Sequence, residues 1–436
     1  MMARQMKDSG VEWIGEIPDG WDICRIKDYF LVKNGSTPNS SKSNYWNGDI
    51  PWITPSDYKT NDVYINVSAR TITKEGYDSC GTNMVPANSI IVSNRAPIGS
   101  VGIAKIPLCT SQGCKSLVKK SDIESKFVYY FLAISDSELN ILGRGTTFLE
   151  LSSYDLGLFA ISIPPINEQK KIVDFLDEKV EEIESVIEKT KETIDDYKKY
   201  KQAIISDAVT KGLNPNVRVK KSKNEYLGMI PIHWNEKRIR FLGTCQNGIS
   251  KSSEYFGEGY PFISYGDVYK NYALLNKGNG LVKSSKSDRE IYSVQYGDVF
   301  FTRTSETIEE VGFASTCLKT IEDAVFAGFV IRFRPNSQQE LLPEFSKYYF
   351  RSDIHRRFFV KEMNLVTRAS LSQELLKKLP VLLPLLEEQK EIAEYLDKKC
   401  SEIDNLIMKK EELLVDLESY KKSLIYEYVT GKKEIR

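Results

Sequence analysis

The chain has 436 residues, which is enough for two to four domains with hydrophobic cores of their own. Lysine and arginine number 60 together, and so do aspartate and glutamate, so bulk charge does not indicate non-specific binding to nucleic acid. Seven cysteines without a CxxC pair, two histidines and no apolar run near the ~18 residues of a membrane span argue against a zinc site, a secreted protein or a membrane protein, and we expect reduced thiols in a soluble, cytoplasmic protein.

The first predicted element is a short opening segment that recurs in the second half of the chain. Residues 12–26 (EWIGEIPDGWDICRI) match residues 225–239 (EYLGMIPIHWNEKRI), and in both an Ile-Pro pair precedes a tryptophan. A segment of this kind is expected to pack a short strand and a large aromatic ring against the surface of a domain. We therefore expect Trp21 and Trp234 to be core anchors.

Two strand-rich blocks follow the openers, at residues 22–162 and 235–382. Short β-branched runs bounded by Gly or Pro predict strands at 89–93, 101–104 and 115–118, and again at 298–302, 312–314 and 329–333. A helix is expected after each set, at about 126–134 and from about 344 to 350. The blocks resemble each other only in places, with freely differing loops, which suggests two modules on one scaffold that recognise different things.

A long stretch closes each block, and its sequence recurs in the second copy without a gap. Residues 163–210 align with residues 383–430 without a gap, and 19 of the 48 positions are identical. The chain is therefore a tandem duplication. Apolar residues in a 3–4 rhythm predict a helix of about 44 residues, roughly 65 Å long, with a heptad seam.

Such a seam needs a partner, and the other copy is the simplest one, which predicts an intramolecular coiled coil. The alternative is that each helix packs on its own globular domain. Residues 214–224 (NPNVRVKKSKN) are polar, contain a proline and show no periodicity, so they are predicted to be a linker. The predicted order is a globular domain at 1–162, a helix at 163–213, the linker at 214–224, a second globular domain at 225–382 and a second helix at 383–436.

Common catalytic motifs are missing from the sequence. It contains no phosphate-binding GxxxxGK[ST] loop, no GxGxxG, no Asn/Asp-Pro-Pro-aromatic tetrapeptide of the amino-methyltransferase kind and no GxSxG. The two isolated histidines, His233 and His355, are expected to be structural. A nuclease or methyltransferase with an unrecognised site remains one alternative, which binding of S-adenosylmethionine or DNA cleavage by the purified chain would reveal.

Several loops combine glycine with side chains that suit nucleic acid, and they recur at corresponding places in both blocks. Arginine pairs best with guanine and asparagine or glutamine with adenine, while serine, threonine and lysine also suit phosphates. Ordinary turns are the alternative interpretation of each loop. The candidate DNA-binding residues are Lys33, Asn34, Ser36, Thr37, Asn94, Arg95, Gln112, Arg144 and Thr146 in the first block and Asn247, Ser250, Lys251, Arg303, Thr304 and Arg368 in the second.

The alternation of variable blocks with repeated helices resembles the specificity subunit of a type I restriction-modification system. Each block opens with Ile-Pro-x-x-Trp and closes with P-x-x-x-E-Q-x-x-I, seen at Pro164…Glu168-Gln169…Ile172 and at Pro384…Glu388-Gln389…Ile392. The Gly35-Ser36-Thr37-Pro38 loop and the Ser111-Gln112-Gly113 turn also fit the first domain of that family.

The resemblance implies an α+β fold with two strand-rich α/β target-recognition domains, separated by two long helices that pair as an antiparallel intramolecular coiled coil with pseudo-twofold symmetry. Each domain would bind one half of a bipartite, asymmetric target in double-stranded DNA, and the helices would set the spacing of the half-sites. Two methyltransferase subunits and restriction subunits would be the partners and would carry S-adenosylmethionine, ATP and Mg²⁺, so that this chain would need no cofactor and perform no catalysis.

Exposed groups on the helices are candidates for the methyltransferase interface, namely Gln169, Lys170, Gln389 and Lys390; a solvated helix face is the alternative. A different function class is a non-enzymatic coiled-coil adaptor whose two domains bind protein. Retention on DNA at low salt, lost steeply as salt is added, would separate the two classes.

Overall fold

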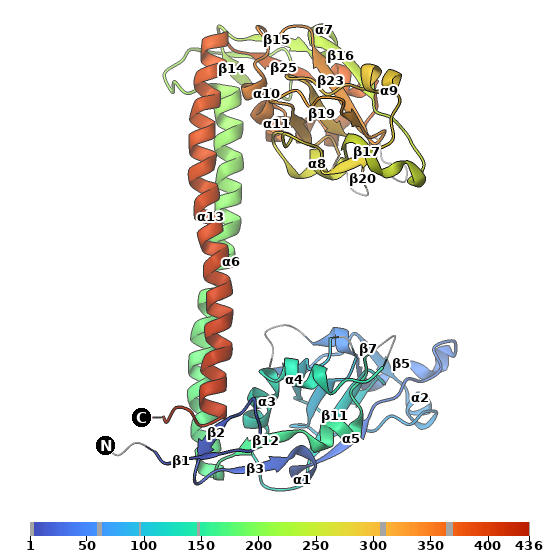
Figure 1. The fold of residues 1–436 in the computed structure, drawn as a ribbon, viewed down its shortest axis with the longest axis vertical. Coiled ribbons are helices and arrows are strands. Elements are labelled where there is room, and N and C mark those ends of the chain that lie inside the picture. Colours follow the sequence, from blue (N-terminus) through green and yellow to red (C-terminus); the bar gives the residue numbers. More distant parts are fainter. Residues whose placement is uncertain are drawn as a thin grey trace. The chain divides into compact units, whose positions relative to one another are not determined.

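The structure is a computed structural model that describes residues 4–58, 63–95, 97–145, 149–305, 311–362 and 369–435 (Figure 1). The chain divides into two compact units. Unit 1 comprises residues 1–191 and 411–436, and unit 2 comprises residues 192–410. Each unit therefore holds one strand-rich block together with part of each long helix.

Unit 1 is built on a five-stranded sheet in the order β4-β11-β8-β9-β6. These strands are β4 (Phe30–Asn34), β11 (Cys114–Lys119), β8 (Ile90–Ser93), β9 (Val101–Ala104) and β6 (Tyr64–Ile65). A three-stranded sheet contains β10 (Cys109–Thr110), β5 (Trp46–Ile53) and β7 (Arg70–Ile72), and two strand pairs contain β1 (Met6–Asp8) with β2 (Glu16–Pro18) and β3 (Asp22–Arg25) with β12 (Ala160–Ile163). The short helices are α1 (Ile26–Tyr29), α2 (Lys74–Asp78), α3 (Ser125–Ala133), α4 (Asp136–Ile141) and α5 (Ser153–Leu158).

Unit 2 is built on a four-stranded sheet in the order β16-β23-β19-β21. These strands are β16 (Gly243–Asn247), β23 (Val330–Pro335), β19 (Val299–Thr302) and β21 (Ala314–Thr316). Smaller sheets contain β17 (Phe256–Ile263) with β18 (Gly280–Val282) and β22 (Val325–Phe326), β13 (Val219–Lys221) with β14 (Met229–Pro231), β15 (Asn235–Arg238) with β25 (Pro380–Leu383), and β20 (Thr304–Ser305) with β24 (Ala369–Ser370). The short helices are α7 (Ile239–Leu242), α8 (Tyr265–Lys270), α9 (Lys286–Ile291), α10 (Pro343–Tyr349), α11 (Asp353–Glu362) and α12 (Gln373–Lys378).

The two main sheets share one backbone frame. In unit 1, β11 lies antiparallel between β4 and β8, and in unit 2, β23 lies antiparallel between β16 and β19. Asn34 pairs with Lys115, and its counterpart Asn247 pairs with Ile331. The duplication read from the helices therefore extends into the blocks, although few of their residues are identical.

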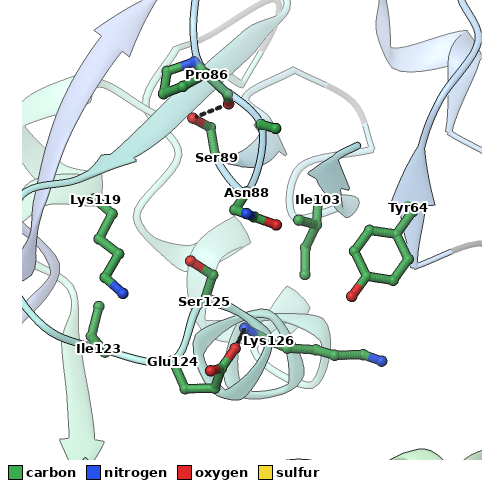
Figure 2. A pocket seen from close by; sticks show the side chains of 11 residues that line it. Tyr64, Pro86, Asn88, Ser89, Ile103, Lys119, Ile123, Glu124, Ser125 and Lys126 are labelled. Carbon is green, nitrogen blue, oxygen red and sulfur yellow. Dashed lines mark hydrogen bonds between the residues drawn. The ribbon is translucent and has the colours of Figure 1, made fainter. Parts of the chain in front are cut away.

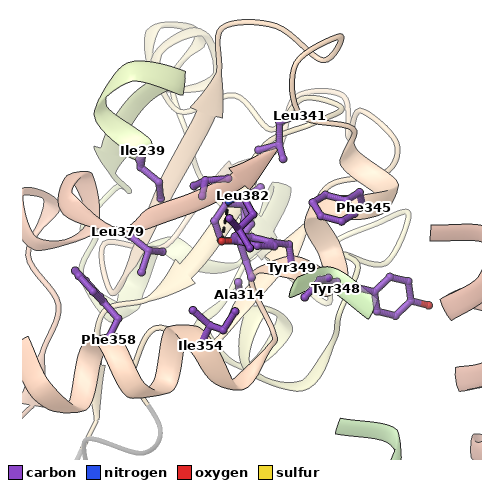
Figure 3. Packing of buried hydrophobic residues seen from close by; sticks show 14 of the residues in the cluster. Ile239, Ala314, Leu341, Phe345, Tyr348, Tyr349, Ile354, Phe358, Leu379 and Leu382 are labelled. Atoms are coloured by element: carbon purple, nitrogen blue, oxygen red, sulfur yellow. Dashed lines mark hydrogen bonds between the residues drawn. The ribbon is translucent and has the colours of Figure 1, made fainter. Parts of the chain in front are cut away.

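The predicted core anchors are confirmed. Trp21 and Trp234 are both fully buried, each within the main hydrophobic cluster of its unit. In unit 2 that cluster packs the aromatic residues of α10 against β25 and α11, as Figure 3 shows for Phe345, Tyr349, Leu382 and Phe358. The Tyr349 hydroxyl donates to Pro380 O at 3.2 Å and accepts from Leu382 N at 2.9 Å, so this buried polar group is satisfied.

Two long helices connect with both units: α6 (Ile166–Lys211) has 46 residues and α13 (Leu386–Val429) has 44. In unit 1 they run antiparallel, because the ring of Phe175 lies 4.5 Å from that of Tyr428 and Glu184 accepts from Lys421 at 2.6 Å. In unit 2 they also run antiparallel, with Lys201 bonded to Asp404 at 2.6 Å. The predicted antiparallel coiled coil is confirmed within each unit.

The alternative, in which each helix packs on its own globular domain, also holds at the ends of the helices. Ile172 and Leu176 of α6 belong to the core cluster that contains Phe127, and Ile392 and Leu396 of α13 belong to the cluster that contains Phe345. The same helices therefore bury one stretch against a globular block and another against each other.

Some predicted boundaries differ from the structure. The stretch 214–224 contains β13, which pairs with β14 as β1 pairs with β2 in unit 1, so its second part is a strand. The predicted strand at 312–314 begins at Ala314, because residues 311 and 312 form a turn.

All seven cysteines are free thiols. Among the described helices, none combines the length and the apolar character of a membrane span.

The expectation that Gln169 and Gln389 are exposed is wrong. Gln169 is 2% exposed, accepts from Glu124 N at 2.8 Å and donates to Pro164 O at 2.8 Å. Gln389 is 1% exposed and makes the matching bonds to Leu342 N and Pro384 O. Both amides satisfy backbone groups where a helix meets its block, so their polarity signals buried hydrogen bonding. The neighbouring Lys170 and Lys390 are exposed, as expected.

Candidate nucleic-acid interface

One edge of the main sheet in unit 1 gathers most of the predicted DNA-binding residues. It lies where β4 and β8 end and β11 begins, because β11 runs antiparallel to both neighbours. We call this set of residues the polar edge of unit 1; it consists of Asn34, Ser36, Thr37, Asn94, Arg95, Gln112, Lys115 and Glu150. Four segments that are far apart in sequence meet there.

Lys115 and Glu150 lie at the centre of the polar edge of unit 1. The Lys115 ammonium donates to Asn34 Oδ1 at 2.9 Å and lies 4.0 Å from a Glu150 oxygen. Glu150 also accepts from Asn94 Nδ2 at 3.0 Å and from the Arg95 guanidinium at 3.0 and 3.2 Å. Lys115 is only 8% exposed, and burial lowers the pKa of its ammonium, an effect that Glu150 opposes. One carboxylate thus holds three donor side chains, of which Asn94 is 0% exposed and Arg95 is accessible from solvent.

The loop after β4 is held close to the turn before β11. Ser36 N donates to Thr110 O at 2.9 Å, and the Thr37 hydroxyl bonds the Gln112 side chain. A Cβ at Gly35 would lie 2.0 Å from Ser111 O, so only glycine fits this approach. Side chains on both loops therefore face solvent from a fixed backbone.

Other candidates of the first block lie at the margin. Lys33 is exposed on β4, opposite Ser116. The Arg144 side chain is 80% exposed and donates to Asp155 at 3.0 Å. Thr146 lies outside the described residues.

Unit 2 presents the corresponding edge, which we call the polar edge of unit 2; it consists of Asn247, Ser250, Lys251, Arg303 and Thr304. Asn247 ends β16, and its side-chain oxygen is buried without a hydrogen-bond partner. Lys251 lies 3.2 Å from Asp288, and Ser250 is exposed. Arg303 donates to Gly328 O at 3.5 Å. Arg368 lies outside the described residues.

Backbone hydrogen bonds show which residues of the two edges correspond. Asn94 N donates to Gly113 O and its carbonyl accepts from Leu151 N; likewise Arg303 N donates to Phe329 O and its carbonyl accepts from Leu371 N. The bridge between Arg95 and Glu150 matches the pair formed by Thr304 and Ser370. The positions held in unit 1 by Asn94, Arg95, Lys115 and Glu150 are held in unit 2 by Arg303, Thr304, Ile331 and Ser370.

Sequence reasoning missed two residues of the polar edge of unit 1 and one buried cation in the sheet of unit 2. Lys115 was assigned to a strand without a role, and Glu150 was not singled out. In unit 2 the missed cation is Arg332, which lies inside β23, is 6% exposed and bonds Ser293 O at 2.6 Å and the side chain of Gln246. Burial lowers the pKa of its guanidinium to about 10. A cation inside an otherwise apolar strand, as in CKSLVK and VIRFRP, is the sequence signal that could have found Lys115 and Arg332.

A pocket of about 350 Å³ opens at the opposite end of the same strands in unit 1 (Figure 2). Asn88, Lys119, Ser125 and Lys126 line it, and the last of these is held by Asp177 at 2.6 Å. Because the pocket lies at the start of β8 and the end of β11, it is separate from the polar edge of unit 1. At the matching place in unit 2, Gln338 bonds Tyr296 O at 3.1 Å.

The fold and the edges define a class of protein: a duplicated recognition protein, with two related units that offer different polar side chains from one strand frame. Within the described ranges, no three His, Cys, Asp or Glu residues are grouped so that they could hold a metal ion.

The family is clear from comparison with known proteins. Residues 18–195 and 231–414 match the family model described as the type I restriction modification DNA specificity domain. The chain belongs to this family, and each of the two matches covers one block with part of a long helix.

Individual relatives agree with this assignment. The MjaIX type I restriction enzyme specificity subunit of Methanocaldococcus jannaschii is 35% identical over 310 residues, covering 68% of this chain and 69% of the relative. The EcoKI specificity subunit of Escherichia coli K12 is 25% identical over 411 residues, covering 90% and 84%.

Two solved structures share the fold. A chain from a study of complex assembly and conformational transition of the type I R-M system has a TM-score of 0.71 at 16% identity, covering 96% of this chain and 99% of that one. The HsdS subunit of Thermoanaerobacter tengcongensis has a TM-score of 0.51 at 16% identity, covering 96% and 98%.

Proposed function

We propose that this chain confers DNA sequence specificity on a type I restriction-modification complex, with each polar edge binding one half of a bipartite target. The observation that carries the proposal is the exchange of side chains on a common backbone frame. Arg95, Lys115 and Glu150 in unit 1 are replaced by Thr304, Ile331 and Ser370 in unit 2. Two edges of such different chemistry select different base pairs, so the target is asymmetric.

The side chains at the edges suit the major groove. Arginine donates two hydrogen bonds to guanine, and asparagine or glutamine exchanges a donor and an acceptor with adenine. Arg95 and Gln112 offer these groups in unit 1, and Arg303 offers them in unit 2. Asn94 is 0% exposed and the side-chain oxygen of Asn247 is buried, so these two amides do not offer both groups to a base. Lys33 and Arg144 at the margin of unit 1, and Lys251 in the polar edge of unit 2, would contact phosphates and add a salt-dependent share of the affinity.

The partners in this proposal are two methyltransferase subunits and, in the complete enzyme, restriction subunits. They would supply S-adenosylmethionine, ATP and Mg²⁺, and the chain itself would perform no catalysis. Lys170 and Lys390 are exposed in the first turns of α6 and α13, directly after the point where each helix joins its block, and they are the candidates for a methyltransferase contact. The buried Gln169 and Gln389 have no such role.

The test of the proposal is modified-base sequencing of genomic DNA from the source cell, with and without the gene. The expected result is that one bipartite, asymmetric motif loses its methyladenine when the gene is deleted. An unchanged methylation pattern, together with no sequence preference of the purified complex in a binding assay, would contradict the proposal.

The rival function is an adaptor that binds protein through both units. It would explain the duplication and the helices, but it gives no reason why each edge carries an arginine and an asparagine. Measured retention on duplex DNA separates the two functions, because binding through phosphates weakens steeply as salt is raised.

A further inference from the structure

A phenyl ring stands exposed in the middle of the polar edge of unit 2. Phe329 lies between β22 and β23 and is 65% exposed, although its neighbours Ala327 and Val330 are 7% and 0% exposed. Its carbonyl accepts from Arg303 N at 2.9 Å, so the ring belongs to the same edge as the candidate arginine. An exposed ring at this place can cover an apolar group of a partner that binds the polar edge.

The turn that carries Phe329 is rigid. Gly328 N donates to Ile249 O at 2.8 Å, Val330 N donates to Ala327 O at 3.0 Å, and Gly248 N donates to Val330 O at 3.2 Å. A Cβ at Gly328 would lie 2.4 Å from Ser250 Oγ, which places the Ser250 hydroxyl next to the turn. These bonds hold the backbone of the turn on both sides, and the Phe329 ring is exposed on this turn.

Unit 1 cannot present the same group. The counterpart of Phe329 is Gly113, whose carbonyl accepts from Asn94 N at 3.0 Å. A Cβ at Gly113 would lie 3.0 Å from the Pro55 ring, which leaves no room for an aromatic side chain without displacement. The exposed ring is therefore a property of unit 2 alone, and it is not required by the fold.

The chemistry of the groove limits what the ring can contact. A phenyl group offers no hydrogen bond, so it gains affinity only by covering an apolar group. At the base edges of the major groove, the 5-methyl group of thymine is that apolar group, and the neighbouring Arg303 suits the same groove. Insertion between base pairs would instead require unstacking, which costs a few kcal/mol per step.

We propose that Phe329 contacts the 5-methyl group of a thymine in the half-site that unit 2 binds, an assignment that rests on the proposed function of that unit. The ring makes unit 2 select an A·T pair through the methyl group, beside the hydrogen-bonding selection by Arg303. Unit 1 selects its half-site without this contact.

The experiment replaces thymine by uracil, one position at a time, in a duplex that carries the motif identified by modified-base sequencing. Binding of the full chain with its partner subunits is measured by equilibrium titration. At one thymine of one half-site, the exchange is expected to raise Kd by about fourfold, the effect of one methyl group returned to water. In the Phe329→Ala variant the same exchange should leave Kd almost unchanged, because the ring that covered the methyl group is gone.

Phe241→Ala is the matched control. Phe241 is 66% exposed, like Phe329, but it lies on α7 at the other end of β16. This variant should respond to uracil like the wild type, which shows that loss of an exposed ring elsewhere in unit 2 does not change the response.

The outcomes distinguish the inference from the proposed function. A wild-type protein that prefers its motif but tolerates uracil at every thymine overturns the role of Phe329 and leaves the proposed function intact. An equal uracil effect in wild type and Phe329→Ala also overturns it. Absence of any sequence preference in the wild type overturns both.

Discussion

At the scale of single residues, the contacts of Arg95 suit a side chain that changes partner. Its guanidinium is paired with Glu150, and the two side chains are 47% and 41% exposed. An ion pair this accessible contributes less than ~1 kcal/mol to stability. In the proposed function, Arg95 would exchange the carboxylate for a base edge at little cost, and Glu150 would hold its side chain in place before DNA binds.

Replacing the edge arginines tests their role. Arg95→Ala and Arg303→Ala are each expected to weaken specific binding by ~1–3 kcal/mol and to relax the preference at one base pair, because a bidentate contact is lost. Titration with the motif and with singly substituted duplexes measures both effects. Lys179→Ala removes an exposed ion pair on α6 and should leave binding unchanged. A loss of only a few tenths of a kcal/mol would identify the arginine as a scaffold residue.

A buried histidine makes the stability of unit 2 depend on pH. His355 is 1% exposed, packs against Tyr349 and Phe350, and has an unpartnered Nε2. Burial, with a smaller effect of the neighbouring Arg356, lowers the pKa of its imidazole to about 3. The unfolded chain takes up this proton near pH 6.5 and the folded chain does not, so stability falls as pH falls from about 6.5 towards 3.

The His355→Phe variant should lack this part of the pH dependence. Between pH 7.5 and pH 5, the free energy of unfolding of the wild type should fall by ~2 kcal/mol more than that of the variant. Urea unfolding of both proteins at the two pH values gives the difference. Equal losses in the two proteins would show that other groups cause the acid sensitivity.

At the scale of elements, each long helix is fastened to its block by one buried amide and one carboxylate. Glu168 accepts from the Trp21 indole at 3.1 Å, and Glu388 accepts from the Trp234 indole at 2.9 Å. Gln169 follows in one copy and Gln389 in the other. The repeated Glu-Gln pair thus joins helix, opener and block in each unit, which explains why it occurs twice.

Removing a buried amide should loosen this junction. Gln169→Ala leaves Glu124 N and Pro164 O without their partner, and Gln389→Ala does the same to Leu342 N. Each change is expected to lower the free energy of unfolding by ~2–3 kcal/mol, because buried backbone groups lose their bonds. Denaturant unfolding measures the loss. Lys170→Ala, at an exposed neighbouring position, should change it by less than ~0.5 kcal/mol; a similar loss there would contradict the assignment.

At the scale of the whole molecule, the proposed function gives the paired helices a measuring role. The antiparallel pairing seen in each unit means that a residue removed from one helix must be matched by a residue removed from the other. DNA presents the same groove face about every 34–36 Å, so the half-site spacing is sensitive to helix length.

Deletion of one heptad tests the measuring role. Removing residues 192–198 from α6 alone should abolish specific methylation, because the two helices then differ in length by one heptad and cannot keep all their contacts with the blocks. Removing residues 407–413 from α13 as well should restore pairing and shorten the spacer of the motif by about three base pairs. Modified-base sequencing of cells that carry each gene provides the readout. Methylation of the original motif by either variant would refute the idea.

Much of the molecule could be predicted from the sequence because the evidence is local or exactly repeated. The heptad period of α6 and α13 follows from neighbouring residues, and the offset of 220 between the copies reveals the duplication. Runs of β-branched residues predict the strands at residues 90–93 and 101–104. Trp21 and Trp234 were predictable as core anchors because a large apolar ring that follows an Ile-Pro pair gains most by being buried.

The polar edges and the helix junctions were decided only by tertiary structure. Lys115 and Glu150 are 35 positions apart in the printed sequence, and only the order β4-β11-β8 brings them to Asn34 and Asn94. Gln169 was expected to be exposed because it is polar. It is buried instead, because its amide makes hydrogen bonds with backbone groups of the block. The physical reason is the same in both cases: a periodic apolar face can be read along the chain, whereas a hydrogen bond depends on which distant segment arrives beside it.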